Sequence, residues 1–264
     1  MTWRIKDLGP EDEAEFCLCL ESWSDEMAES GAHRREWLER MKSAGLGVKL
    51  AITDDGDYAG MIQYYPAAYS PARSDEDGLW FIHCIWVHGH QGGQGNFQGK
   101  GIGTALLKAA EDDVRSRGGR AILAWGLALP FWMKARWYRS RGYHPVDRDG
   151  VRTLVMKSLD GAEHRAVWRR PGPPPIEAVD GTLRATGFVS GACSVAGIGW
   201  ERLKTAVAGL PVSLELIDSS DPDNLEHWGR SDVLYIGRRR VDLGPPPTVK
   251  KLRRTVHREL RRLR

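Results

Sequence analysis

The sequence predicts an α+β domain with a mixed, mostly antiparallel sheet and flanking helices, followed by a small α/β domain. Three observations support this prediction. The 264 residues are 41% hydrophobic and include 30 glycines, which is the composition of a globular chain that can bury a core. Residues 169–175, Arg-Arg-Pro-Gly-Pro-Pro-Pro, favour polyproline II over helix or central strand. The order of predicted strands and helices also differs on the two sides of this run.

The first domain is predicted over residues 1–158. Asp54-Asp55-Gly56-Asp57 is a strong hairpin turn between two strands. A long strand follows at Leu79 to Val87, and a helix from Gly101 ends near Arg117, before Gly118-Gly119. The predicted elements, with strands and helices in chain order, cover residues 3–8, 10–44, 48–53, 58–65, 79–87, 101–117, 121–125, 131–141, 143–146 and 151–157.

Residues 159–175 form the predicted linker, and residues 176–264 form the second domain. Its predicted order is strand, helix, strand, helix, two strands and helix. Gly209 and Pro211 end the first of these helices, and Gly237-Arg238 forms the turn of the hairpin. The predicted elements cover residues 186–189, 196–209, 212–218, 222–228, 232–236, 239–243 and 249–264.

Charge is distributed unevenly along the chain. Residues 1–159 carry a net charge of −2 and residues 160–264 a net charge of +5, much of it between Lys250 and Arg264. A nucleic-acid partner is one interpretation of this excess. The apolar residues of the same stretch recur at helical spacing, which favours an amphipathic helix with a solvated basic face. We therefore expect no membrane partner and treat nucleic acid as the weaker alternative.

The sequence offers no signal peptide and no membrane span. Charges at Arg4, Lys6 and Asp7 leave no apolar region near Met1. The longest uncharged run, residues 185–200, is 16 residues long and is rich in Gly and Ser. Four scattered cysteines do not form a disulfide framework. The prediction is a cytoplasmic protein.

A glycine-rich segment connects the strand that ends in Ile85-Trp86-Val87 to the next helix. It reads Gln98-Gly99-Lys100-Gly101-Ile102-Gly103-Thr104. A helix N-terminus leaves amides unpaired and carries partial positive charge, and glycines let an anion approach those amides. Neither the Walker loop nor the dinucleotide fingerprint fits this spacing. The segment is therefore either a pyrophosphate site or a loop that only turns the chain.

Two motifs together resemble the GNAT acetyltransferase superfamily over roughly residues 1–158. The first is Gln98-x-x-Gly101-x-Gly103, and the second is the run Ala135 to Tyr143, Ala-Arg-Trp-Tyr-Arg-Ser-Arg-Gly-Tyr. The resemblance implies a splayed sheet and acetyl-CoA as co-substrate, with no metal. Backbone amides of Ile85, Trp86 and Val87 would pair with pantetheine, and those of the segment from Gly99 to Thr104 would wrap the pyrophosphate.

The resemblance also implies a general acid. Tyr138 matches the tyrosine that protonates the departing thiolate, a step that a positioned O–H group assists. Strand alternation puts His83 on the same face as Ile85 and Val87, so His83 is the candidate base, either directly or through a water relay. A histidine packed against Phe81 is the alternative. His83, His88 and His90 match no common zinc spacing.

Two departures from the family pattern concern the acceptor side. The loop from His88 to Phe97 is long, and Trp132 stands where many members have Asn. Several tryptophans fall on elements expected around the cleft. They belong either to the core or to an aromatic acceptor pocket, and they are Trp80, Trp86, Trp125, Trp132 and Trp137.

The second domain resembles a thioredoxin-like domain with one redox cysteine. Cys193 lies between a strand and a helix, where the helix N-terminus favours the thiolate. Ala196 stands where a second cysteine would be, and Ser231-Asp232 lacks the proline of such redox domains. An unreactive cysteine on a retained scaffold and a monothiol role both stay open.

We predict an N-acetyltransferase that moves an acetyl group from acetyl-CoA directly to the amine of a small-molecule or peptide acceptor. Tyr138 would be the acid, and His83 or a water relay the base. The alternatives are a non-catalytic acyl-CoA sensor that binds a partner, and a thiol protein that acts through Cys193. Neither the acceptor nor the oligomeric state follows from the sequence.

Overall fold

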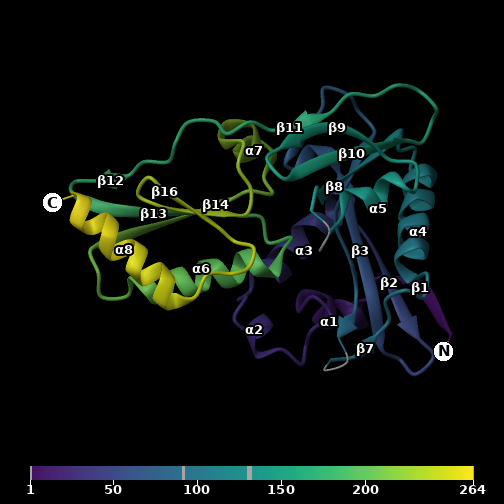
Figure 1. Ribbon diagram of the computed structural model, residues 1–264, viewed down its shortest axis with the longest axis horizontal. Coiled ribbons are helices and arrows are strands. Elements are labelled where there is room, and N and C mark those ends of the chain that lie inside the picture. The colour runs from purple at the N-terminus through teal and green to yellow at the C-terminus, as the bar shows by residue number, and fades with distance from the viewer. Residues whose placement is uncertain (1, 91–92, 130–132, 264) are drawn as a thin grey trace. The chain divides into compact units, whose positions relative to one another are not determined.

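The computed structural model describes residues 2–90, 93–129 and 133–263. The chain forms two compact units (Figure 1). Unit 1 consists of Met1–Glu13 and Met41–Trp168, and unit 2 of Ala14–Arg40 and Arg169–Arg264. Over the described residues, no helix is long and apolar enough to cross a membrane.

Unit 1 contains a seven-stranded sheet in the order β1-β2-β3-β5-β8-β10-β9. Every neighbouring pair is antiparallel except β5 and β8, so the expected mixed, mostly antiparallel sheet is confirmed. The sheet strands are β1 (Trp3–Asp7), β2 (Gly47–Thr53), β3 (Tyr58–Pro66), β5 (Leu79–Val87), β8 (Ala121–Leu127), β9 (His144–Asp149) and β10 (Arg152–Ser158). The short elements of this unit are η1 (Pro10–Asp12), η2 (Ala67–Tyr69), β4 (Ala72–Arg73), β6 (Gly89–His90), β7 (Gly95–Asn96) and β11 (Val167–Trp168).

Helix α4 (Ile102–Ser116) packs on this sheet through one apolar face. Leu106, Ala110 and Val114 recur at helical spacing and are all fully buried. The predicted ends of the helix are confirmed: Gly101 precedes it with φ +82°, and Gly118 follows it with φ +76°. Helix α5 (Ala135–Arg139) is shorter than the predicted helix, whose start at Phe131 and Trp132 lies outside the described residues.

Strands β5 and β8 separate halfway along their length. Their parallel pairing runs only from Leu79 opposite Ala121 to Ile82 opposite Ala124. Both strands continue beyond that point, β5 on β3 and β8 on β10. The expected splay in the sheet is therefore present.

The C-terminal part of unit 2 is a sheet in the order β14-β13-β15-β16, with β12 extending one side of β13. Strands β13 and β14 are parallel, and the other pairs are antiparallel. The elements are β12 (Ala178–Val179), β13 (Thr182–Val189), α6 (Ser194–Val207), β14 (Val212–Asp218), α7 (Pro222–Trp228), β15 (Val233–Ile236), β16 (Arg239–Asp242) and α8 (Val249–Leu263). Apart from the short strand β12, the order of elements is the predicted one.

The N-terminal helical segment of unit 2 differs from the prediction. A single interrupted helical region becomes three helices: α1 (Glu13–Cys17), α2 (Asp25–Ala28) and α3 (His33–Ser43). The buried guanidinium of Arg34 donates to the carbonyl oxygens of Phe16 and Ala192. Arg202 of α6 forms ion pairs with Glu26 and Glu29. These contacts join residues 14–40 to the C-terminal part, whereas the sequence assigned all of residues 1–158 to the first domain.

Candidate active site

The start of α4 is an open cluster of backbone amides. Gly99 and Gly101 both have positive φ angles, +75° and +82°, and a Cβ atom at either position would meet no atom within 4 Å. Within the described residues, no acceptor takes the amides of Gly101, Ile102 and Gly103. These amides and the helix dipole favour an anion. The cradle predicted from the glycine pattern is therefore geometrically open.

Two cations lie close to this cradle. The Lys100 ammonium lies 5.3 Å from the centre of the Phe97 ring. Arg141, which follows α5, donates to the Thr104 hydroxyl from Nε at 3.2 Å and from Nη2 at 2.9 Å. Its guanidinium also stacks 4.0 Å above the Trp137 ring. Arg141 is thus held at the first turn of α4, a placement that no motif in the sequence indicated.

Gln98 connects the glycine-rich segment to the end of β5. Its side-chain amide donates to the Val87 carbonyl oxygen at 3.4 Å. A Cβ atom at Gly89 would lie 2.3 Å from this amide, so a larger residue there would displace the Gln98 side chain. The Gln98 side chain therefore holds the glycine-rich segment against the end of β5.

The predicted pantetheine strand lies beside the splay. Ile85, Trp86 and Val87 pair with β3 on one edge, and the β8 pairing on the other edge has already ended at Ile82. Trp125 of β8 spans the gap with its indole N–H, which donates to the His83 carbonyl oxygen at 2.8 Å. Beyond that bond, this edge of β5 has no strand partner in the described part of the chain.

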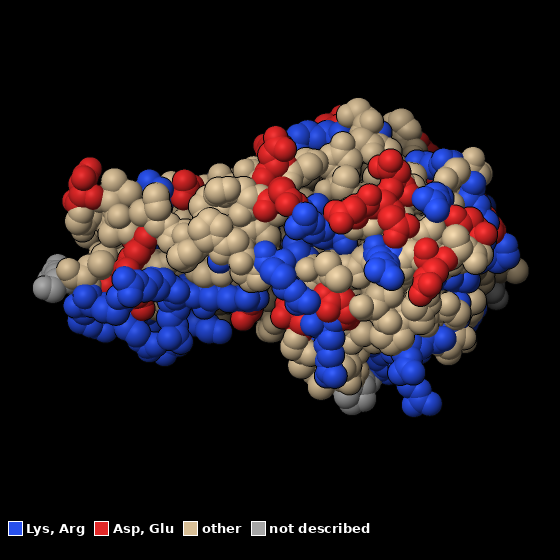
Figure 2. Space-filling model, turned by 90° about the horizontal axis from the view of Figure 1, so that it is seen from above, with Lys and Arg blue, Asp and Glu red and all other residues tan. Residues whose placement is uncertain are grey.

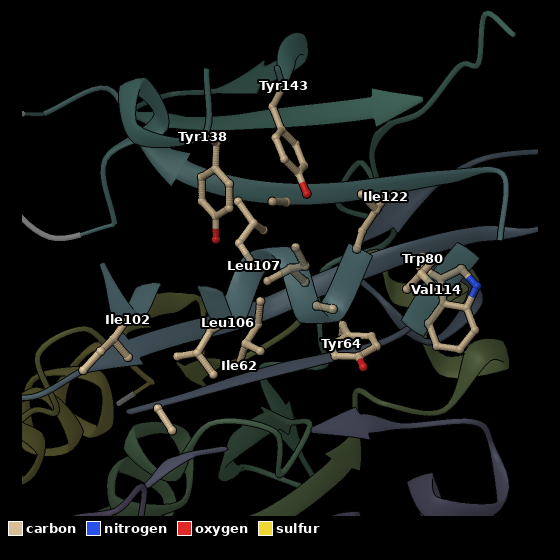
Figure 3. Packing of buried hydrophobic residues seen from close by; sticks show 14 of the residues in the cluster. Ile62, Tyr64, Trp80, Ile102, Leu106, Leu107, Val114, Ile122, Tyr138 and Tyr143 are labelled. Carbon is tan, nitrogen blue, oxygen red and sulfur yellow. The ribbon is translucent and has the colours of Figure 1, made fainter. Parts of the chain in front are cut away.

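Tyr138 of α5 is buried with an unsatisfied hydroxyl. Its side chain is 1% exposed, and the hydroxyl has no hydrogen-bond partner among the described residues. Burial raises its pKa well above the usual value, and Cys84 adds to the effect. The ring packs against Trp137 and Tyr143. Figure 3 shows Tyr138 at the same end of the cluster as Ile102, with Trp80 and Val114 at the other.

The sequence of this chain matches a protein-family model. The model described as "Acetyltransferase (GNAT) family" matches residues 10–143, just over half of the chain. The chain belongs to the GNAT acetyltransferase family. Both sequence motifs lie within the match. A comparison with curated proteins gave no match.

Solved GNAT structures resemble the chain at low identity. A family protein from Desulfovibrio desulfuricans is 23% identical, covers 60% of this chain and 99% of its own, and has a TM-score of 0.44. YhbS from Escherichia coli, solved with CoA, is 14% identical, with coverages of 63% and 89% and a TM-score of 0.43. A Brucella melitensis acetyltransferase, solved with acetyl-CoA, is 18% identical, with coverages of 63% and 96% and a TM-score of 0.42.

His83 lies differently from the sequence prediction. A β-bulge interrupts the β3–β5 register at this residue, because Gln63 pairs with Cys84 but Tyr64 pairs with Ile82. The strict alternation that put His83 on the face of Ile85 and Val87 was therefore wrong. Ile85 and Val87 pack on the cluster under α4. The His83 ring instead contacts Phe81 and Tyr65, and its Nδ1 lies 2.8 Å from the Tyr65 hydroxyl.

The histidines near the end of β5 do not form part of a metal-binding group in the described residues. No group of three or more His, Cys, Asp or Glu side chains is positioned there to hold a metal. His88 is buried with its ring 6.0 Å from Trp86. His90 lies in β6, and its side chain is outside the described part of the structure.

Cys193 occupies the N-cap position of α6 in unit 2. Burial raises the pKa of its thiol to about 12, and the Asp232 carboxylate adds to this shift. The expected stabilisation of the thiolate by the helix N-terminus is therefore outweighed. All four cysteines, Cys17, Cys19, Cys84 and Cys193, are free thiols.

Proposed function

We propose that this GNAT protein is an N-acetyltransferase that moves an acetyl group from acetyl-CoA directly to the amine of a small-molecule or peptide acceptor. The observation that carries the proposal is the buried, unsatisfied Tyr138 hydroxyl in the same core cluster as the first residue of α4. A buried O–H group without a partner is costly unless a ligand or a reaction uses it. The open amide cradle supplies the matching anion site.

The residues present fit an acyl-CoA. The amides of Gly101, Ile102 and Gly103 would bind the pyrophosphate, because Gly99 and Gly101 leave the space before them open. Lys100 and Arg141 add positive charge beside it. The free edge of β5 from Ile85 to Val87 would bind the pantetheine amides. Acetyl-CoA supplies the activated acetyl group when it is bound.

Tyr138 would hold the proton that the departing sulfur needs. A tyrosine hydroxyl is neutral at physiological pH, and burial raises the pKa of Tyr138 further, so the group is present as a proton donor. Its buried position excludes water from that proton. We keep His83 or a water relay as the proposed base. The His83 ring lies against Phe81 and Tyr65, and its Nδ1 contact with the Tyr65 hydroxyl would fix its orientation there.

We also propose that residues 176–264 form a thioredoxin-like domain. The strand order β14-β13-β15-β16 with one parallel pair supports this, as does the position of Cys193 at the start of the helix after β13. The raised pKa of Cys193 favours the interpretation of a retained scaffold over an active thiol.

Calorimetry with CoA, followed by an acetyl-transfer assay over a panel of amines, tests the proposed function. We expect heat of binding, protection from thermal melting, and acetylation of at least one amine class. Binding of CoA without acetylation of any amine would favour a non-catalytic sensor. Absence of CoA binding would exclude both the N-acetyltransferase and the acyl-CoA sensor.

A further inference from the structure

Helix α8 of unit 2 packs most of its apolar face within the fold, and only Leu263 at its end is exposed. Leu252 and Val256 are fully buried, and they belong to the same core cluster as Leu203 of α6 and Leu234 of β15. Apart from Leu263, the helix therefore has little apolar surface left to insert into a second surface. Its opposite face is available only for polar contacts.

That opposite face carries a stripe of uncompensated cations. The five lysine and arginine side chains of this basic stripe form no ion pair with any carboxylate of the described chain. They are Lys250, Lys251, Arg254, Arg258 and Arg261. At 3.6 residues per turn, all five fall within an arc of about 100° and along about 16 Å of the helix axis. Figure 2 shows a blue band with little red at the left of the view.

Nearby acids do not neutralise the basic stripe. Glu259, the only acid of α8, is buried and pairs with Arg262. Glu177 pairs with Arg238 and Arg262. By contrast, the exposed cations of α4 in unit 1 are compensated, since Lys108 and Arg115 both pair with Asp112. A row of like charges without local partners is unfavourable for the isolated fold and favourable for a bound polyanion.

We propose that the basic stripe of α8 binds the phosphodiester backbone of a nucleic acid. Guanidinium groups at successive helical turns can each take a phosphate, with bidentate geometry. The buried apolar face disfavours a membrane, because interfacial helices bind bilayers by inserting that face. Contacts to phosphate alone make the binding independent of base sequence. This activity is separate from acetyl transfer.

Fluorescence anisotropy with the full-length protein and a labelled 20-base-pair DNA duplex tests the proposal. Five phosphate contacts predict a slope of log K against log salt near −4.5. Arg254→Gln with Arg258→Gln removes two of them, so we expect the slope to become shallower by about 1.8 and the affinity at low salt to fall roughly tenfold.

The matched control removes two exposed arginines outside the stripe, Arg4→Gln with Arg35→Gln, and should bind like the wild type. Thermal melting of both double variants checks that the fold is intact. The proposal is overturned if the wild type does not bind the duplex, or if the two double variants bind equally well. Binding to vesicles that contain phosphatidylserine, without binding to the duplex, would overturn it in favour of a membrane surface.

Discussion

The unsatisfied hydroxyl of Tyr138 gives the sharpest prediction at the scale of single residues. Tyr138→Phe removes a buried group that has no partner in the described structure, so the free energy of unfolding should not fall. Acetyl transfer should slow by about 10²–10³-fold if the hydroxyl is the general acid. Steady-state kinetics and thermal melting measure the two effects. A large loss of stability with unchanged kcat would mean that Tyr138 is a core residue only.

Single residues also show what the sequence could and could not predict about the site. The cradle was predictable because Gly99 and Gly101 stand at positions that need positive φ. The orientation of His83 was not, because a bulge depends on the register of the partner strand β3. The placement of Arg141 was missed because its contact with Thr104 joins residues 37 apart, and the motif that contains Arg141 does not indicate that contact.

Close packing between elements makes one glycine indispensable. A Cβ atom on Gly126 of β8 would lie 2.5 Å from the Ala135 backbone nitrogen and 2.8 Å from the Met133 carbonyl oxygen. We expect Gly126→Ala to lower the free energy of unfolding by about 2 kcal/mol or more, because backbone must move. Gly103→Ala is the control: its Cβ would lie 3.4 Å from Trp137, so stability should hold. Urea denaturation of both variants measures the difference, and equal losses would refute the packing argument.

A histidine network ties the segment after β10 to the loop before β5. The His164 ring is fully buried and bonds to the carboxylates of Glu76 at 2.6 Å and Asp160 at 2.9 Å. The Glu76 hydrogen bond raises the pKa of His164, and Asp160 adds to it. The folded state therefore holds this proton more tightly than the unfolded chain does.

The sign of the pH effect follows from that raised pKa. The stabilisation is complete below the pKa of His164 in the unfolded chain, about 6.5. It is lost as the pH rises through the higher pKa of His164 in the folded state. We expect His164→Gln to cost about 2 kcal/mol at pH 6. The difference in free energy of unfolding between wild type and variant should be smaller at pH 9. Urea unfolding at both pH values measures it, and a gap that widens with pH would contradict the assignment.

At the scale of the whole molecule, the order of the long strands and of most helices was predictable from local patterns, but the division of the chain into units was not. The sequence predicts one interrupted helical region over residues 10–44, which includes α3, yet it does not say which core that region covers. The contacts that assign Ala14–Arg40 to unit 2 span more than 150 residues of sequence, as Arg34 and Ala192 illustrate. No local signal encodes such a pairing.

Cutting the chain after Trp168 tests this division. Phe16 and Trp37 are fully buried, and both belong to the part of unit 2 that the fragment 1–168 would retain without its partners. We expect this fragment to melt at a lower temperature than the full chain, or to aggregate. Circular dichroism against temperature measures the effect. Identical melting of fragment and full chain would show that residues 14–40 need nothing beyond Trp168.

The discontinuous make-up of unit 2 has a consequence for biosynthesis. Arg40 leaves the ribosome about 130 residues ahead of Arg169, where the C-terminal part of unit 2 begins. At roughly 5–20 residues per second, the nascent helices wait on the order of ten seconds with their apolar side chains uncovered. During that interval we expect these helices to bind a chaperone. They can bury their apolar side chains only after residues 169–264 have been synthesised.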